Sequence, residues 1–251
     1  MKAPRAKVVI HPKDYTTVMS WDYKRILSAS IWRSIITEAK GELRRGVLAL
    51  HNDPNLPSAF TFSNIFAESS KGTKKGIIAE GDLTFYFTTP IKELMDLFVQ
   101  ALENGNFHPR FLKIESIDVK VQKIPVKPRM KLKTLSEVLV RAKTDLGRRD
   151  LYPTNPLFTK LIKSNLARKY YYINGDVPGD WLKIDVEWFK PKRYDYGKLG
   201  KYRVSYMGLT LEGPKDLIAV ALTSGIGHKN ALGFGMLTPR EDEDLHGGGY
   251  L

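Results

Sequence analysis

Hydrophobic and polar positions in the first half of the chain follow two kinds of periodicity. Apolar residues three and four positions apart predict helices over Tyr23–Lys40, which Gly41 ends, and over Pro90–Asn104. Alternation of apolar and polar residues predicts strands over Ala6–Ile10, Ala59–Glu68, Leu83–Thr88 and Phe111–Ile124. The predicted order is β-α-β-β-α-β, which is the ferredoxin-like pattern.

The second half repeats this order of elements without repeating its sequence. The predicted extended segments are Met130–Ala142, for which a helix is the alternative, Trp181–Pro191, Tyr202–Leu211 and a short last strand from Gly235. The predicted helices are Asn155–Tyr171 and 214–224. We therefore expect an α+β protein of two tandem ferredoxin-like (RRM-like) domains, residues 1–124 and 129–240, joined by the Pro125–Pro128 linker. Residues 241–251, acidic and then glycine-rich, are expected to be disordered.

Composition agrees with a folded protein and excludes several kinds of site. The chain has 251 residues, of which 42% are hydrophobic, and no apolar run is long enough to span a membrane. It contains no cysteine, which excludes disulfides, thiolate zinc sites and cysteine nucleophiles. We expect a cytoplasmic protein that does not associate with a membrane.

Positive charge is concentrated in one stretch of the chain. The formal net charge is +13, and residues 120–203 alone hold 21 Lys or Arg against 8 Asp or Glu. Such a concentration is typical of a surface that binds nucleic acid, although a solvated basic face has the same composition.

Four glycines lie close together near the C-terminus, at positions 225, 227, 233 and 235. Glycine costs backbone entropy, so this cluster indicates a loop whose N–H groups approach a ligand, often phosphate. A dinucleotide-binding fingerprint would place a strand before the glycines and a helix after them, whereas here the predicted helix comes first. A P-loop also fails, because Lys229 follows its glycine too early and no Ser or Thr comes after it. We expect no cofactor.

This loop resembles the glycine-rich signature of the RAMP superfamily. More closely, it is similar to that of the archaeal CRISPR-associated endoribonucleases that cut precursor CRISPR RNA at each repeat. Their pattern G-x-G-x-K-N-x-x-G-F-G is matched by Gly225, Gly227, Lys229, Asn230, Gly233, Phe234 and Gly235. The resemblance implies two tandem ferredoxin-like domains and CRISPR repeat RNA as the partner.

The resemblance also implies a reaction and a place for it. In that family the ribose 2′-hydroxyl attacks the adjacent phosphate without a metal ion and leaves a 2′,3′-cyclic phosphate and a 5′-hydroxyl. This chemistry needs a base, an acid and positive charge on the phosphorane. The catalytic histidine of the family corresponds to His51, which precedes the F-T-[YF]-S match at 60–63.

Two positions depart from the family. Its catalytic tyrosine falls on Trp32, and its catalytic lysine falls near Ser58, in a segment that has no lysine. The candidate catalytic residues are therefore His51, Trp32 and Ser58. The missing positive charge has several candidate donors near the first helix, namely Lys24, Arg25, Lys40, Arg44 and Arg45.

The expected RNA contacts combine the glycine loop with a basic hairpin that the family places on the repeat RNA. They are Gly225, Gly227, His228, Lys229, Asn230, Gly233, Gly235, Lys190, Lys192, Arg193, Lys198, Lys201 and Arg203. Tyr194, Tyr196 and Tyr202 are candidates for base stacking, with hairpin packing as the alternative, and Arg148 and Arg149 for further phosphate contacts. No metal-binding motif occurs, so we expect no metal site.

Two other functions stay open at this point. The chain could hold repeat or guide RNA without cutting it, with other CRISPR effector subunits as partners. The loss of the tyrosine and lysine favours this alternative, and His51 argues against it. An unrelated basic RNA chaperone on the same scaffold is the third hypothesis, and a homodimer is compatible with any of them.

Overall fold

The computed structural model describes residues 1–145, 147–176, 182–195 and 200–240. The strands of the first half are β1 (Lys2–Pro12), β2 (Thr16–Met19), β3 (Thr61–Phe62), β4 (Phe66–Gly72), β5 (Ile77–Thr88) and β6 (Ile114–Pro125). Its helices are α1 (Tyr23–Glu38), α2 (Gly41–Asn52) and α3 (Lys92–Glu103). The elements of the second half are β7 (Arg129–Thr134), β8 (Val140–Thr144), β9 (Gly147–Leu151), α4 (Leu157–Asn174), β10 (Lys183–Asp195), β11 (Lys201–Glu212), α5 (Lys215–Ser224), the 3-10 helix η2 (Asn230–Leu232) and β12 (Leu237–Pro239).

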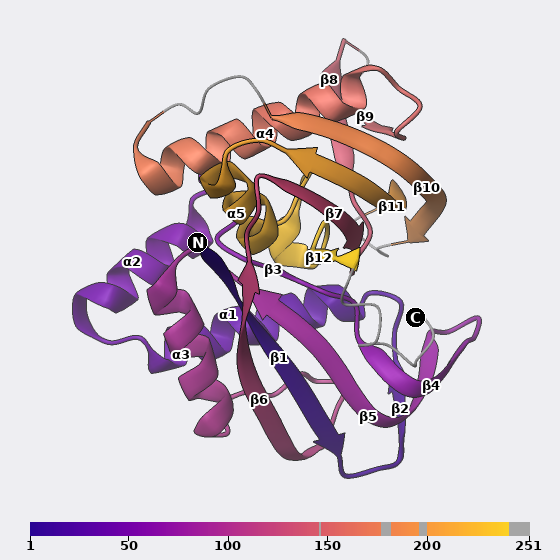
Figure 1. Cartoon of the computed structure of the whole chain (residues 1–251). Helices are drawn as coiled ribbons and strands as arrows, with labels where there is room; N and C mark the ends of the chain where they lie inside the picture. The colour runs from indigo at the N-terminus through magenta and orange to yellow at the C-terminus, as the bar shows by residue number, and fades with distance from the viewer. Residues whose placement is uncertain (146, 177–181, 196–199, 241–251) are drawn as a thin grey trace.

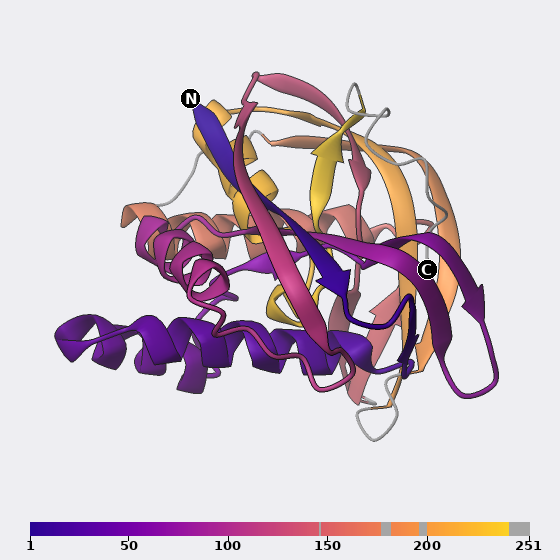
Figure 2. The same cartoon turned by 90° about the horizontal axis from the view of Figure 1, so that it is seen from below.

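The sheet of the first half is antiparallel and centred on β1 and β5. The order β6-β1-β5 is extended by β2, β3 and β4, which all pair with β5. Alternate residues of β1, namely Ala6, Val8 and Ile10, are buried in one core with Leu27 of α1 and Phe98 of α3. Figures 1 and 2 show the helices of this half on one side of the sheet.

The sheet of the second half has the order β10-β11-β7-β12, and all of its neighbouring strands are antiparallel. Leu209 and Leu211 of β11 are buried with Phe158 of α4 and Ile218 of α5 in a second core. The strands β8 and β9 form a separate hairpin beside this sheet. An α+β fold with two antiparallel sheets is therefore confirmed.

The segment around Gly41 differs from the prediction. Gly41 does not end α1 but begins α2, with φ of +54°. No helix was predicted here, because Gly41 was taken as the end of the preceding helix; most of α2 is solvent-exposed, and Val47 is its only buried residue. As a consequence, His51 lies in the last turn of a helix and not in a loop.

Three further differences concern strands. The predicted strand over Ala59–Glu68 is interrupted, since Asn64 leaves the sheet and its N–H donates to the Leu135 carbonyl oxygen of the second half (3.1 Å). The strand β2 and the β8–β9 hairpin were not predicted. The expected tail at 241–251, Lys198 and Tyr196 lie outside the described residues.

The two halves are tied together by buried side chains. Arg5 of β1 is 1% exposed and donates to the Leu237 carbonyl oxygen (2.6 Å) and to Thr238 Oγ1 (2.9 Å) of the second half.

Of the helices that the structure describes, none combines the length and the apolar composition that a membrane crossing needs.

Candidate RNA-processing site

One stripe of α1 connects the glycine loop to His51. Lys24, Ser28 and Trp32 are four residues apart and therefore share one face of the helix. Lys24 Nζ donates to the Gly233 carbonyl oxygen (3.0 Å), and Ser28 Oγ donates to the Ala231 carbonyl oxygen (2.6 Å). The third residue of the stripe, Trp32, reaches the helix that carries His51.

The structure brings His51 and Trp32 into contact. Their ring centroids are 4.8 Å apart, with an angle of 34° between the planes. Trp32 is 8% exposed and packs on Phe60, at 4.9 Å between centroids, whereas His51 is exposed. An exposed imidazole held against a buried indole is free to meet a substrate. Ser58 is half-buried in the segment between α2 and β3, and among the described residues it makes no hydrogen bond to His51.

The cations that the sequence offered for this site are differently placed. Lys24 is 0% exposed and ion-paired with Glu137, so it cannot serve a substrate, and that prediction was wrong. Arg25 pairs with Asp22 on its own helix turn.

Two arginines remain beside the His51 segment. Arg44 lies seven positions before His51 on α2, so both residues share a face of that helix. Arg168 of α4 is exposed, and its guanidinium donates to the Asn55 carbonyl oxygen, four residues after His51. The second half thus brings a positive charge to the segment in which the family lysine is missing.

The glycines of the loop are buried, and internal packing explains them. Gly225, Gly227, Gly233 and Gly235 all have φ between +72° and +79°. A Cβ at Gly235 would lie 1.9 Å from the Ile226 carbonyl oxygen, and one at Gly233 would lie 2.3 Å from the Phe62 ring. The glycines therefore allow the loop to fold on itself and to pack against β3. The expectation that they approach phosphate is corrected by this internal packing.

Asn230 is also occupied inside the protein. It is 1% exposed, and its Nδ2 donates to the carbonyl oxygens of Ile226 (2.9 Å) and Phe234 (2.8 Å). Its Oδ1 accepts a hydrogen bond from Lys169 Nζ of α4 (2.7 Å). The prediction that Asn230 contacts RNA is corrected by this burial, because both ends of the amide are bound within the fold.

Lys169 was not recognised in the sequence, yet it supports the loop. Besides Asn230 it donates to the carbonyl oxygens of Ser224 (3.0 Å) and Gly225 (2.6 Å), where α5 ends. Burial lowers the pKa of Lys169 to about 7.

His228 and Lys229 are half-buried polar members of the loop. His228 Nδ1 accepts a hydrogen bond from the Arg141 backbone N–H (3.3 Å), and burial lowers the pKa of the imidazole. Lys229 has a left-handed backbone, with φ of +58°, and its Nζ donates to Tyr202 Oη (2.7 Å).

A buried ion pair lies beneath the loop. Glu137, 1% exposed, accepts hydrogen bonds from Lys24, from Lys192 (3.2 Å) and from Tyr206 Oη (2.8 Å). Burial alone raises the pKa of Glu137, but the charges of Lys24 and Lys192 outweigh it and hold the pKa at about 2. Its backbone carbonyl accepts from the Gly235 N–H (2.8 Å). The only signal in the sequence was a single acid within an apolar stretch.

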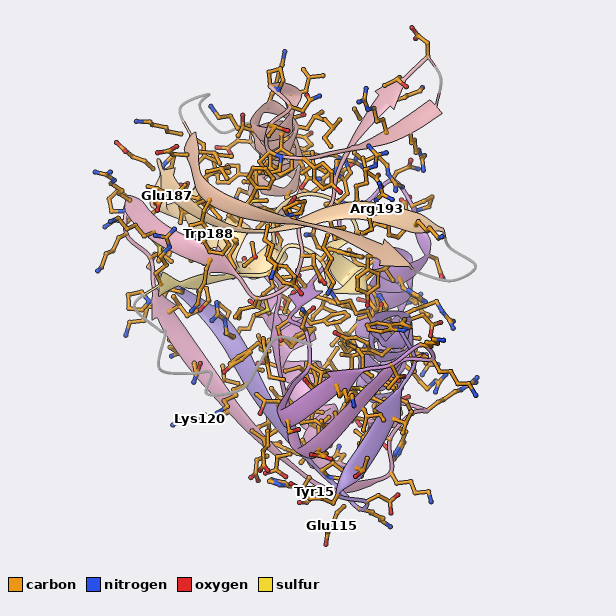
Figure 3. All side chains as sticks on the ribbon, turned by 90° about the vertical axis from the view of Figure 1, so that its right-hand side faces the viewer. Tyr15, Glu115, Lys120, Glu187, Trp188 and Arg193 are labelled. Atoms are coloured by element: carbon orange, nitrogen blue, oxygen red, sulfur yellow. The ribbon has the colours of Figure 1, made fainter. Side chains whose placement is uncertain are left out.

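The basic hairpin keeps most of its predicted charges on the surface. Lys190 and Arg193 of β10, and Lys201 and Arg203 of β11, are exposed, whereas Lys192 is half-buried against Glu137. Figure 3 shows Trp188, 48% exposed, and Arg193 well separated along β10. The predicted phosphate contacts Arg148 and Arg149 are exposed on β9.

The candidate stacking residues of the hairpin are packed inside. Tyr194 is 6% and Tyr202 5% exposed, and both rings meet Phe234 edge-on, at 6.0 and 6.2 Å between centroids. The alternative given by the sequence, hairpin packing, therefore describes these two tyrosines.

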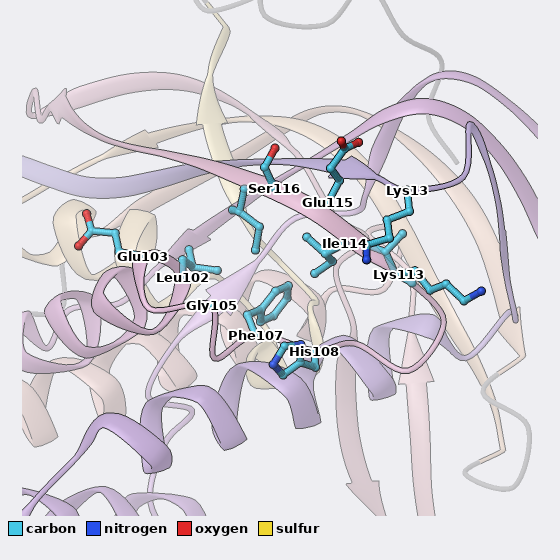
Figure 4. Close-up of a pocket in the computed structure, with 12 residues that line it drawn as sticks. Lys13, Leu102, Glu103, Gly105, Phe107, His108, Lys113, Ile114, Glu115 and Ser116 are labelled. Atoms are coloured by element: carbon cyan, nitrogen blue, oxygen red, sulfur yellow. The ribbon is translucent and has the colours of Figure 1, made fainter.

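A hollow of about 540 Å³ lies apart from these residues, between the end of α3 and the start of β6. Figure 4 shows that His108 and Phe107 line it together with Lys113 and Glu115. Its mixed charges do not favour an anionic ligand.

Within the described residues, no group of three His, Asp or Glu side chains is arranged to hold a metal ion.

Comparisons with known proteins identify the family. Residues 119–239 match the model of the CRISPR-associated protein Cas6, C-terminal. The CRISPR-associated endoribonuclease Cas6 of Pyrococcus furiosus is 31% identical, over 72% of this chain and 70% of its own length. The chain belongs to the Cas6 family.

Other Cas6 proteins match over almost the whole chain. A CRISPR-associated endoribonuclease Cas6 of Methanocaldococcus jannaschii is 28% identical over 92% of this chain and 91% of its own length. The solved structure of the product of a Cas6-related gene from Pyrococcus furiosus superposes with a TM-score of 0.82, at 25% identity, over 96% of this chain and all of that one. The resemblance of the glycine loop to RAMP proteins is thereby confirmed.

Proposed function

We propose that this chain is an endoribonuclease that binds CRISPR repeat RNA and cleaves precursor CRISPR RNA within each repeat. The 2′-hydroxyl attacks the adjacent phosphate, and the products carry 2′,3′-cyclic phosphate and 5′-hydroxyl ends. The observation that carries the proposal is the exposed His51, seated on Trp32 at the end of the α1 stripe that holds the glycine loop. Membership of the Cas6 family supports it.

Each half of the proposed enzyme is a ferredoxin-like domain, over residues 1–124 and 129–240. This part of the proposal is supported by the strand orders β6-β1-β5-β4 and β12-β7-β11-β10, which are the same when each half is numbered separately. The loop of the second domain rests on α1 and β3 of the first, so the position of His51 depends on both domains.

His51 is the proton carrier in this mechanism. An imidazole nitrogen can act as either proton acceptor or proton donor, so His51 can accept the 2′-hydroxyl proton or donate one to the leaving 5′-oxygen. Trp32 cannot exchange a proton and instead positions the imidazole by packing beneath it. Arg168 and Arg44 supply positive charge for the phosphorane, and Ser58 is a candidate hydroxyl donor.

The RNA contacts of the proposal are reduced to side chains that remain accessible. They are His228, Lys229, Lys190, Arg193, Lys201, Arg203 and the exposed part of Lys192. The four glycines and Asn230 shape the loop that presents His228 and Lys229.

The test compares His51→Ala with the unchanged protein on its cognate repeat RNA, in cleavage and in binding. We expect cutting to fall about 100- to 10,000-fold, because general acid-base catalysis contributes that much, while the dissociation constant stays nearly constant. Arg168→Ala should slow cutting in the same assay with a smaller effect on binding. Cutting that persists in His51→Ala would contradict the assignment.

A second function is favoured by one observation, the tryptophan at the position of the catalytic tyrosine. A chain that binds repeat RNA without cutting it would serve as a subunit of a CRISPR effector complex. Tight, salt-sensitive binding with no cutting by the unchanged protein would support this alternative over the first.

A further inference from the structure

A basic pocket with an aromatic wall lies away from His51, at the junction of the two domains. Its volume is about 610 Å³, within the range of small-ligand sites. Three segments line it: Trp21 and Asp22 before α1, Lys74 and Lys75 in the turn between β4 and β5, and residues 192–194 of β10. Figure 3 shows Arg193 of this group at the edge of the upper sheet.

The pocket is strongly positive, and most of its basic side chains are exposed to solvent. Lys74, Lys75 and Arg193 are exposed, and none of the three pairs with a carboxylate among the residues that the structure describes. Its one acid, Asp22, is already neutralised by Arg25 at 2.8 Å. Hydrogen bonds from Ser20 and Arg25 lower the pKa of Asp22, although burial opposes them. The pocket therefore suits an anion.

Trp21 is held rigidly in the wall of this pocket. Its Nε1 donates to the Thr73 carbonyl oxygen (3.2 Å), and its own carbonyl oxygen accepts from Tyr194 Oη (2.9 Å). The absence of a side chain at Gly72 lets the indole approach β4, since a Cβ there would lie 3.3 Å from Cη2. Even so, 37% of Trp21 stays exposed. A fixed, partly exposed indole loses little entropy when a flat ligand stacks on it.

Cations interleaved with an accessible aromatic ring are the usual means of binding single-stranded nucleic acid. We propose that this pocket binds one unpaired nucleotide of the RNA substrate, with the base stacked on Trp21 and adjacent phosphates on Lys74, Lys75 and Arg193. The inference rests on the proposed function, because it assigns a subsite to that RNA. An acidic peptide would use the lysines and the arginine, but its carboxylates are not attracted to the negative face of the indole.

The test measures binding of repeat RNA by Trp21→Leu, over a series of RNAs that each lack one base. Stacking on an aromatic ring contributes enough for a loss of about 5- to 100-fold on intact RNA. The loss should vanish for the RNA without the base that occupies the pocket and persist for the other RNAs. Tyr15→Leu, which removes a 67% exposed ring outside the pocket, is the matched control and should bind normally.

The charges are tested separately by the double variant Lys74→Ser/Lys75→Ser. The slope of log affinity against log salt should become less steep by about 1.4, as for two phosphate contacts with a single strand. Trp21→Leu should leave this slope unchanged. The control Lys160→Ser/Lys163→Ser removes two charges from α4. An equal decrease of the salt slope in this control would overturn the proposal, because any two lysines would then contribute equally to RNA binding.

The outcomes separate this inference from the proposed function. If the unchanged protein neither binds nor cuts repeat RNA, the proposed function fails. If it does both and Trp21→Leu binds as tightly, or loses the same factor on every RNA of the series, only the pocket is refuted. Trp21→Phe keeps a stacking ring and should recover part of the affinity, so a folding defect in Trp21→Leu does not decide the result.

Discussion

Lys169 places its amino group in the interior next to three oxygen acceptors. Two of them are carbonyl oxygens at the end of α5, where the helix dipole carries partial negative charge. The third is Oδ1 of Asn230, so this single side chain holds the glycine loop against α4 and α5. Neither its burial nor its partners could be predicted from the sequence, where it is one lysine among many in a basic stretch.

The titration of Lys169 predicts a pH dependence of stability. The pKa is about 7 in the folded protein and near 10.5 in the unfolded chain, so between these values only the unfolded chain binds the proton. The free energy of unfolding should therefore rise with pH from 7 to about 10, by at most about 1.4 kcal/mol per pH unit, and stay level below 7. Denaturant titrations at several pH values measure this rise, which Lys169→Met should lack.

The control for this prediction is Lys160→Met, on the exposed side of the same helix. It should keep the pH dependence of the unchanged protein. If Lys169→Met also keeps it, the buried amino group has an ordinary pKa and its three acceptors stabilise the charge.

Among the structural elements, the glycine loop has a pattern that identified the family. A single sequence does not tell which atoms its glycines approach. In the structure the close neighbours are the protein's own Ile226 carbonyl oxygen, the Leu139 carbonyl oxygen and the Phe62 ring. The glycines therefore serve the internal packing of the loop and its contact with the first half of the chain.

The substitution Gly235→Ala should lower the stability of the fold. The new Cβ would overlap the Ile226 carbonyl oxygen, and φ is +74°. Gly105→Ala is the matched control, with φ of +70° and no neighbour within 4 Å, so it bears only the backbone cost. We expect Gly235→Ala to lose about 1–3 kcal/mol more than Gly105→Ala in thermal or denaturant unfolding. Equal stability of the two variants, with RNA binding lost only in Gly235→Ala, would restore the phosphate-binding interpretation.

Periodicity predicted the elements that bury one regular face and missed those that do not. The helix α3 buries Leu94, Met95, Phe98 and Leu102 and was predicted within two residues of its bounds. The helix α2 buries only Val47, and its first residue, Gly41, was taken for the end of α1. The contact of His51 with Trp32 depends on this helix, so family resemblance and not periodicity suggested His51 as a candidate.

Across the whole molecule, buried polar side chains join the first half of the chain to the second. Lys24 of the first half pairs with Glu137 of the second under the glycine loop, and Arg5 binds the β12 segment. Removing one partner of a buried ion pair is strongly destabilising, and Lys24 binds both Glu137 and the Gly233 carbonyl oxygen. This pair therefore helps to hold the glycine loop between the two halves.

Attack by the ribose 2′-hydroxyl is tested with two versions of the cognate repeat RNA in the presence of a chelator. One is all ribose, and the other carries a single 2′-deoxy sugar immediately before the cut. We expect only the all-ribose RNA to be cleaved, with an upstream product that ends in a 2′,3′-cyclic phosphate. Cleavage of both RNAs, or products with a free 3′-hydroxyl, would contradict attack by the 2′-hydroxyl and with it the role given to His51.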